Sequence, residues 1–386
     1  MTAQPVSDSI TGVFELQERH GGWLRTPATN YVASSEDCFV PETLASAAGL
    51  RGGETVAGVF ERVNGPQNGP RRRLVKVMEI EGQPSEVHLD RPSFESLTAI
   101  DPCRAIRFET DGGPPSMRIV DLLTPIGFGQ RGLIVAPPRT GKTILLQQMA
   151  QGVGANHPHA QIIMLLIDER PEEVTQMRRS VPAEVVASSN DKDVESHVRL
   201  ARLVIERGKR IVESGRDAVI LMDSLTRLGR AFNAFIRTSG RIMSGGLDIR
   251  ALTEPKAVFG AARNVEHGGS LTIIASALVD TGSRMDEVIF NEFKGTGNME
   301  IMLSRDMANR RIWPAIDLQA SGTRREELLL TPEALTVSVR VRRSLLNESA
   351  ERGMEMLLDT MKKFPSNAAM IEHFAKTSPR PGSRGI

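Results

Sequence analysis

The stretch GLIVAPPRTGKTILLQQMA, residues 132–150, constrains the fold more than any other part of the chain. An apolar run leads into a short loop, then into Gly141-Lys142-Thr143 and a segment of helical character. Strand, loop and helix in this order form a P-loop, where backbone N–H groups and a helix N-terminus hold phosphate oxygens. Ala136 stands where the general pattern has its first glycine, and a chance loop could carry the same Gly-Lys-Thr letters. The motif nevertheless predicts a nucleotide site.

The predicted roles within this loop follow from side-chain chemistry. Lys142 places positive charge against the β and γ phosphates, and the hydroxyl of Thr143 is a ligand for Mg²⁺. The residues expected to contact ATP are Ala136, Pro137, Pro138, Arg139, Thr140, Gly141, Lys142, Thr143 and Ile144. A second glycine pattern, GFGQRG at 127–132, precedes a strand instead of following one, so it is not interpreted as a dinucleotide-binding motif.

Further apolar runs predict the rest of a sheet around this loop. Continuous runs at 162–168, 218–223 and 271–277 are typical of strands covered on both faces. Between the first two, apolar residues recur near helical spacing after residue 194. This alternation predicts an α/β domain with a mainly parallel sheet.

Acidic residues follow two of these runs at the point where each strand should end. Asp223 is predicted to hold Mg²⁺, although a strand-terminal Asp also caps helices. Glu169 is predicted to orient the attacking water, with Arg170 beside it to hold water or phosphate. A structural ion-pair cluster is the alternative. The carboxyl ends of parallel strands meet at one edge, where ligands bind, so the catalytic interpretation is favoured.

The N-terminal part of the chain has a different pattern. Short alternating segments separated by Gly, Pro and Asn turns predict a small antiparallel barrel of the OB or cold-shock type. The expected division is a flexible N-terminus (1–10), a barrel (11–90), a linker (91–116), an ATPase domain (117–375) and a disordered tail (376–386).

Composition narrows the class of protein. With 40% apolar and 25% charged residues, the chain has no run near the about 20 apolar residues of a membrane helix. No signal peptide is recognised, and two cysteines, Cys38 and Cys103, do not suggest a disulfide framework. A cytoplasmic protein is expected. The net charge of +1 neither requires nor excludes a nucleic-acid partner.

Several long blocks resemble the bacterial transcription termination factor Rho family, over roughly residues 11–350. They are GQRGLIVAPPRTGKT, LLIDERPEEVT, MDSLTRLGRAFN, FGAARNVEHGGSLTIIASALVDTGSRMDEVI, EFKGTGNMEI and SGTRREELL. The resemblance implies a RecA-like, homohexameric, RNA-dependent ATPase and helicase that releases RNA from the RNA polymerase elongation complex. The alanine at position 136 is also found in that family.

The resemblance implies roles for three further residues at the nucleotide. Arg324 in SGTR matches the arginine finger that reaches the ATP of the neighbouring subunit. Arg227 lies in a block similar to the phosphate-sensing region. Trp313 stands where Rho proteins have a phenylalanine that stacks on adenine, and an indole can do the same.

The resemblance also implies two sets of RNA contacts. In the central loops these are Arg241 of SGRIMSGGLD (239–248) and Arg284 of DTGSR (280–284), where Rho commonly has lysine. In the barrel they are Trp23, Arg25, Asp37 and Phe39. Gly21 replaces the first aromatic of the barrel motif, and the helical segment that precedes the barrel in many Rho proteins is missing from this sequence. Weaker or differently selective RNA binding is therefore expected.

Two alternatives remain open at this point. A rotary-type ATPase subunit shares a RecA-like core and a small N-terminal barrel, but the loops that resemble RNA-binding segments argue against it. A degenerate relative that regulates without hydrolysis is disfavoured because the catalytic positions are intact.

Overall fold

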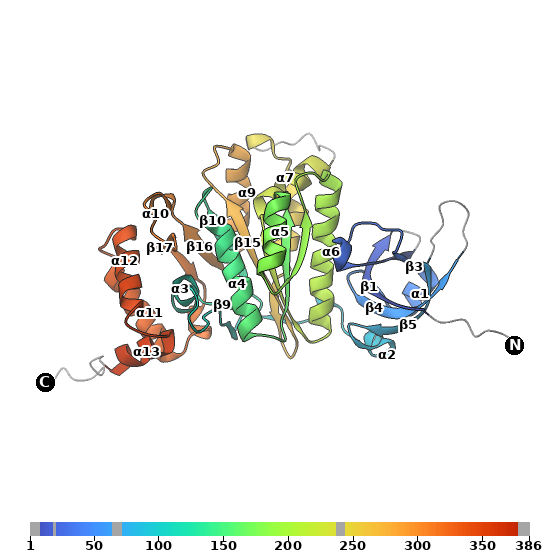
Figure 1. Ribbon diagram of the computed structural model, residues 1–386, viewed down its shortest axis with the longest axis horizontal. Helices are drawn as coiled ribbons and strands as arrows, with labels where there is room; N and C mark the ends of the chain where they lie inside the picture. Colours follow the sequence, from blue (N-terminus) through green and yellow to red (C-terminus); the bar gives the residue numbers. More distant parts are fainter. Residues whose placement is uncertain (1–7, 18–20, 64–71, 237–243, 377–386) are drawn as a thin grey trace.

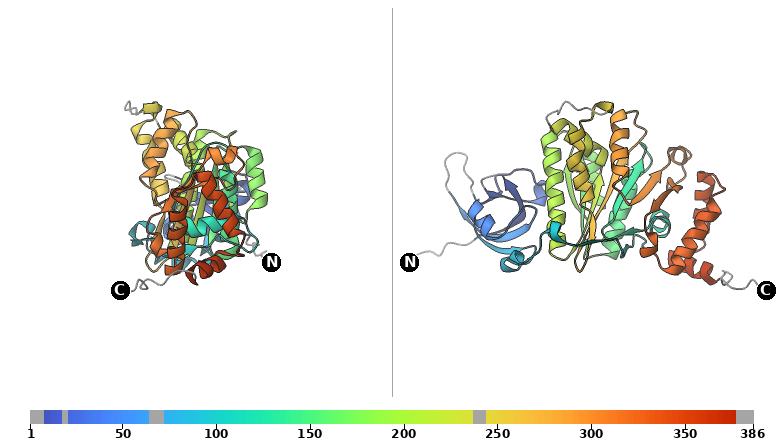
Figure 2. Two further views of the ribbon diagram at one scale, coloured as in Figure 1. Left: turned by 90° about the vertical axis from the view of Figure 1, so that its left-hand side faces the viewer. Right: turned by 180° about the vertical axis from the view of Figure 1, so that it is seen from behind.

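The structure, a computed structural model, describes residues 8–17, 21–63, 72–236 and 244–376. Figure 1 shows three parts along the longest axis: a small β-barrel, a central sheet with its helices, and a group of C-terminal helices. Figure 2 shows the same order from behind. The predicted flexible N-terminus and disordered tail fall mostly outside the described residues, as does Arg241. Across the described ranges, no helix has the length and apolarity needed to cross a membrane.

The N-terminal part is a closed five-stranded barrel, which confirms the predicted fold class. Its strands are β1 (Asp8–Gln17), β2 (Gly21–Arg25), β3 (Cys38–Val40), β4 (Thr55–Arg62) and β5 (Arg72–Ile80). The sheet runs β3-β2-β1-β4-β5, and a parallel pairing of β3 with β5 closes it. Alternate residues of β4 are buried, as expected for strands with one face on a core. That core includes Phe14, Leu24, Val40, Leu74 and Ile80.

Short elements connect the barrel to the central sheet. They are β6 (Gln83–Pro84), α2 (Ser85–Leu89), β7 (Ala99–Ile100), β8 (Ala105–Ile106), α3 (Pro115–Leu123) and β9 (Ile126–Gly127); α1 (Glu42–Ala47) lies within the barrel. The predicted linker therefore contains two short strands. β7 joins the central sheet by pairing with β14, and β8 pairs with β9.

The central sheet has the predicted parallel topology around the P-loop strand. Its order is β12-β11-β13-β15-β10-β16-β17, with β17 antiparallel to β16. The bounds are β10 (Arg131–Ala136), β11 (Gln161–Ile167), β12 (Glu184–Ser188), β13 (Asp217–Asp223), β14 (Arg263–Val265), β15 (Ser270–Leu278), β16 (Met299–Leu303) and β17 (Ile316–Thr323). These bounds match the apolar runs to within about two residues.

Helices cover both faces of this sheet and explain its continuous apolar strands. Along β10, Ile134 and Ala136 pack into one hydrophobic cluster, whereas Leu133 and Val135 pack into the other. Strands buried on both faces lose the apolar–polar alternation of a half-exposed sheet. The helices after the P-loop, including the C-terminal group, are α4 (Lys142–Asn156), α5 (Pro171–Ser180), α6 (Val194–Glu213), α7 (Leu225–Phe235), α8 (Thr253–Gly260), α9 (Arg284–Lys294), α10 (Arg305–Asn309), α11 (Pro332–Leu345), α12 (Ala350–Met361) and α13 (Asn367–Lys376).

The barrel docks on the edge of the central sheet through specific polar contacts. Among the strands that the structure describes, β12 pairs with β11 alone, so its other side is an edge of the sheet. The Asn30 side chain pairs with one residue of this side: its Oδ1 accepts from the Ala187 N–H at 2.6 Å, and its Nδ2 donates to the Ala187 carbonyl. Arg199 of α6 donates through Nε to Glu15 at 2.5 Å. These contacts attach the barrel to α6 and β12.

Candidate nucleotide site and RNA-contact residues

The P-loop connects β10 to α4 and has the conformation that the motif predicts. Thr140 is buried, and its hydroxyl donates to the Pro137 carbonyl at 2.7 Å, which folds the loop back on itself. Gly141 precedes the first helical residue with a φ of 87°, a region that glycine enters without steric cost. Arg139 also has a positive φ, of 66°. The loop thus ends at the N-terminus of α4, where unpaired N–H groups favour an anion.

Lys142, the first residue of α4, lies close to both carboxylates predicted from the sequence, Asp223 and Glu169. Its Nζ donates to Asp223 Oδ1 and lies 3.7 Å from Glu169 Oε1. Asp223 ends β13 and also accepts from the Ser276 hydroxyl at 2.8 Å. Both carboxylates are at least 95% buried, with exposures of 1% for Asp223 and 4% for Glu169. The parallel strands β11 and β13 bring these groups to the same edge as the P-loop.

Glu169 has the electrostatic environment of a proton acceptor. Burial and, to a smaller extent, the neighbouring Asp223 charge together raise the pKa of Glu169 to about 7, against the opposing effects of Lys142 and Arg227. Arg227 Nη1 lies 3.2 Å from Glu169 Oε1 and also donates to the Asp168 carbonyl. A carboxyl whose pKa is near neutrality can both accept and release a proton at physiological pH. Arg170, which precedes α5, is exposed beside this group.

The donor set at this edge suits a hard divalent cation. Asp223 offers a carboxylate and Thr143, the second residue of α4, offers a hydroxyl. Mg²⁺ prefers oxygen ligands and usually combines one or two protein groups with phosphate and water. The residues present therefore fit Mg²⁺ bound together with a nucleotide.

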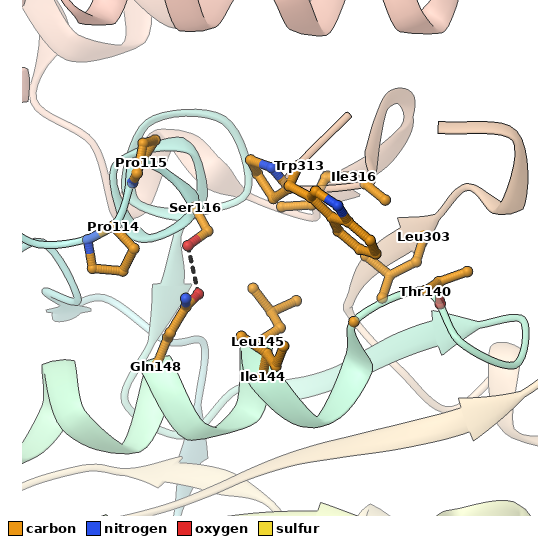
Figure 3. A pocket seen from close by; sticks show the side chains of 13 residues that line it. Pro114, Pro115, Ser116, Thr140, Ile144, Leu145, Gln148, Leu303, Trp313 and Ile316 are labelled. Carbon is orange, nitrogen blue, oxygen red and sulfur yellow. Dashed lines mark hydrogen bonds between the residues drawn. The ribbon is translucent and has the colours of Figure 1, made fainter. Parts of the chain in front are cut away.

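A cavity of about 210 Å³ lies beside the P-loop helix, and Trp313 forms part of its wall. Figure 3 shows the indole above the start of α4, opposite Ile144 and Leu145. The Trp313 ring is close enough to Gly141 that a Cβ there would meet it at 3.0 Å. The indole is 43% exposed, which fits a stacking surface rather than a core position.

Part of this cavity comes from residues that the sequence did not single out. Pro114, Pro115 and Ser116 lie at the start of α3, in the segment predicted as a linker, and form the opposite wall. The Ser116 hydroxyl donates to Gln148 Oε1 of α4 at 2.6 Å (Figure 3). The Pro-Pro-Ser sequence before a helix resembles an ordinary turn, so no local signal marks it as a site.

Arg324 does not join the site of its own chain. β17 runs antiparallel to β16, with Ile316 opposite Leu303 and Thr323 opposite Met299. Met299 in turn pairs with Gly132 near the start of β10. At about 3.3 Å per residue, Arg324 and the P-loop are therefore separated by roughly 15–20 Å along the strands, beyond the reach of one side chain. Arg324 is exposed at the amino ends of the parallel strands, whereas the P-loop lies at their carboxyl ends.

The four predicted barrel residues come together on β2, on β3 and at the residue before β3. The Trp23 and Phe39 rings meet edge to face, with centroids 5.4 Å apart, and both rings are partly exposed. Arg25 is 7% exposed and is paired with Asp37 and, at 2.7 Å through Nε, with Glu15. The aromatic pair is thus open to a ligand, whereas the two charged residues are already bonded to one another.

The structure describes the second predicted central loop, residues 280–284, and the end of the first, residues 244–248. Arg284 is the first residue of α9 and is exposed. Arg241 lies outside the described residues. Gly245, farther along the same loop, has a φ of 81°, and a Cβ there would lie 2.7 Å from the Met285 backbone nitrogen. The described end of the first loop therefore packs against the start of α9, beside the second.

Together, the fold and this site define a RecA-like P-loop ATPase with an OB-like barrel at its N-terminus. Two family models match: the ATP synthase alpha/beta family nucleotide-binding domain over residues 116–323, and the Rho termination factor RNA-binding domain over residues 10–86. The chain is 48% identical to transcription termination factor Rho of Aquifex aeolicus, over 94% of this chain and 84% of that protein. It belongs to the Rho transcription termination factor family.

Other relatives agree with this placement, and a solved structure agrees with the fold. The chain is 48% identical to the Rho factor of Streptomyces lividans, over 97% of this chain but 53% of that protein. It therefore spans about half the length of this relative, and 56% of the Micrococcus luteus Rho factor. An ATPase from a bacterial type III secretion system has a similar structure, with a TM-score of 0.57 at 19% identity over 83% of this chain and 89% of that chain. At that identity the likeness concerns the fold alone.

Proposed function

We propose that this chain is the subunit of a homohexameric, RNA-dependent ATPase that translocates along nascent RNA and releases it from the RNA polymerase elongation complex in the cytoplasm. One observation carries the catalytic part of the proposal: Lys142, Glu169 and Asp223 converge at the P-loop, while Arg324 lies at the opposite edge of the sheet. Each chain thus has every predicted catalytic group at its P-loop except the arginine finger. This arrangement fits a site that is completed by the arginine of a neighbouring subunit. Membership of the Rho family supports the RNA and polymerase partners.

Each residue at the nucleotide then has a chemical role. The N–H groups at the start of α4 bind the phosphates, and Lys142 leaves Asp223 to pair with the β and γ phosphate oxygens. Thr143 and Asp223 would hold Mg²⁺, which would neutralise part of the phosphate charge. Glu169 orients water and accepts its proton, as its pKa of about 7 permits. The exposed Trp313 ring stacks on adenine.

Three other arginines act on the phosphates in this scheme. Arg227, fixed by Glu169 and the Asp168 carbonyl, senses the γ phosphate. Arg170, exposed next to Glu169, holds the attacking water or a phosphate oxygen. Arg324 enters from the neighbouring subunit and stabilises the charge that develops during phosphoryl transfer, an effect of about 10³–10⁵ in rate for such fingers.

RNA is proposed to bind at two places. Bases stack on the Trp23–Phe39 pair of the barrel, with Arg25 and Asp37 beside it. Inside the ring, Arg284 and Arg241 contact the RNA backbone, because phosphate contacts need positive charge and no base specificity.

The test is steady-state ATP hydrolysis with and without poly(C) RNA, with Lys142→Ala as the control. Strong stimulation by RNA, absent in the variant, is the expected result. An ATPase rate that no RNA changes would contradict the proposal and favour a rotary-type ATPase subunit, whose family model matches the same domain. Absence of hydrolysis in the wild-type protein would favour a regulator that binds without hydrolysing.

A further inference from the structure

The backbone from which Arg324 extends is held by one asparagine, Asn298. The Arg324 N–H donates to the Asn298 carbonyl at 2.9 Å. The side-chain Oδ1 of Asn298 accepts from the Arg131 N–H at 2.9 Å and from Gln130 Nε2 at 2.7 Å. The Asn298 N–H donates to the Arg131 carbonyl at 3.0 Å. Asn298 therefore joins the finger segment to the first residue of β10 through both its backbone and its side chain.

The partners of Asn298 are themselves fixed. Gln130 is fully buried, and its Oε1 accepts from the Gly127 N–H at 3.2 Å. One residue before Arg324, the Thr323 hydroxyl donates to the Pro125 carbonyl at 2.8 Å. The segment that ends in Arg324 is therefore tied to the rest of the domain at two consecutive residues.

The guanidinium of Arg324 is exposed, in contrast to this fixed base. Its sequence neighbour Arg325 is committed to ion pairs with Asp101 at 2.9 Å and Glu327 at 3.0 Å. The nearby Arg131 guanidinium donates to the Ala262 carbonyl at 2.9 Å and to that of Thr296 at 3.1 Å. Over the described residues, no ion pair or side-chain hydrogen bond is found for Arg324 itself. It is thus the arginine of this group that remains available to an incoming anion.

We infer that Asn298, with Thr323 as a second tie, is a positioning residue that sets the direction in which Arg324 leaves its subunit. The inference rests on the proposed function, in which Arg324 reaches a neighbour's nucleotide. The same contacts connect the finger to the P-loop through β10. This strand begins at Arg131, which Asn298 binds, and ends at Ala136, where the P-loop begins. A movement of one subunit's P-loop strand is thereby passed to the finger that serves the next subunit.

Removal of the Asn298 side chain leaves the Arg131 N–H without its acceptor and Gln130 Nε2 with only the Asn298 carbonyl at 3.3 Å, so we expect the backbone that carries Arg324 to shift. A misplacement of about 1 Å at a catalytic group can cost on the order of 100-fold in rate. In Asn298→Ala we expect kcat for RNA-saturated ATP hydrolysis to fall about 10- to 100-fold, with KM for ATP changed less than about twofold. Asn291→Ala, at an exposed asparagine of α9, is the matched control and should match the wild type.

The decisive comparison is with Arg324→Ala and the double variant. If Asn298 acts through Arg324, the double variant has the kcat of Arg324→Ala alone. Unchanged binding of a fluorescent ATP analogue to Asn298→Ala shows that its own P-loop is intact. Thr323→Val, which removes the second tie and keeps the side-chain shape, should give the same loss in kcat at constant KM and replaces Asn298→Ala if that variant does not fold.

Mixed rings test the same idea between subunits. Rings formed from Asn298→Ala and Lys142→Ala subunits contain junctions that combine an intact P-loop with a correctly placed finger, so they should hydrolyse ATP faster than either variant alone. A double variant whose loss is the product of the two single losses would overturn the inference, as would wild-type kcat in both Asn298→Ala and Thr323→Val. Wild-type kcat in Arg324→Ala would instead refute the finger of the proposed function.

Discussion

The resemblance to Rho proteins led us to expect an aromatic residue at Gly21, and the structure predicts that introducing an aromatic there would harm the protein. Gly21 begins β2 with a φ of 89°, in the left-handed region. A Cβ at this position would lie 2.1 Å from the Val40 carbonyl oxygen and 2.7 Å from the Glu42 nitrogen. Both are backbone atoms, so no side-chain rotation relieves the contact, and β2 and β3 must separate.

The cost of Gly21→Phe has two parts. A left-handed φ costs a residue with a Cβ about 1–2 kcal/mol. Forcing two strands apart adds a strain of about 1–3 kcal/mol, the usual range for overpacking. The sum is a loss of about 2–5 kcal/mol in the free energy of unfolding. It is as large as or larger than the about 1–3 kcal/mol that one more stacking ring contributes to RNA binding. At about 4–8 °C per kcal/mol for a domain of this size, we expect the thermal transition of the barrel to fall by roughly 8–40 °C.

Thermal unfolding and titration of a labelled oligo(C) measure both effects. Gly21→Ala should lose nearly as much stability as Gly21→Phe, because the Cβ itself makes the contact. Gly82→Ala is the matched control: its φ is 71°, yet nothing lies within 4 Å of the added Cβ, so it reports the φ cost alone. A Gly21→Phe protein that melts like the wild type and binds oligo(C) more tightly would refute this reasoning.

Two further predictions concern the nucleotide site. Because burial and Asp223 raise the pKa of Glu169 to about 7, kcat should rise about tenfold per pH unit below that value and level off above it. The folded pKa exceeds the ordinary 4.5, so the same group's contribution to folding stability is present below pH 4.5 and is lost as pH rises through about 7. Glu169→Gln should remove the activity. If a residual activity of this variant still rises tenfold per pH unit below pH 7, a group other than Glu169 causes the pH dependence. Trp313→Ala should weaken binding of a fluorescent ATP analogue by about 1–3 kcal/mol, roughly 5- to 150-fold, with Trp313→Phe close to the wild type. Affinity within twofold in the Ala variant would exclude the stacking role.

The sequence predicted the architecture because the signals for it are local. A strand buried on both faces is a continuous apolar run, and the runs at 162–168 and 218–223 agree with β11 and β13 to within about two residues. The convergence of Glu169 and Asp223 on Lys142 was predictable for the same reason, since parallel strands deliver their carboxyl ends to one edge. Family resemblance, rather than periodicity, supplied the roles of Arg324 and Trp313.

Contacts between distant segments were not predictable in this way. Pro114 and Ser116 lie in a segment with no periodicity and become a wall of the cavity beside the P-loop only because α3 packs beside α4. Arg25 and Asp37, predicted as RNA contacts, form an ion pair with each other. The role of those residues stays a prediction.

The sequence by itself thus determined the P-loop, the parallel sheet, the barrel and the chemistry gathered at one sheet edge. Only the tertiary structure decided that Gly21 has no room for a side chain, that Asn30 pairs with Ala187 at the edge of β12, and that the Asn298 carbonyl accepts from the Arg324 N–H. The physical reason is that residue pattern reports which face of an element is buried. It does not report which backbone atoms, far away in the sequence, lie within 3 Å of that face after folding.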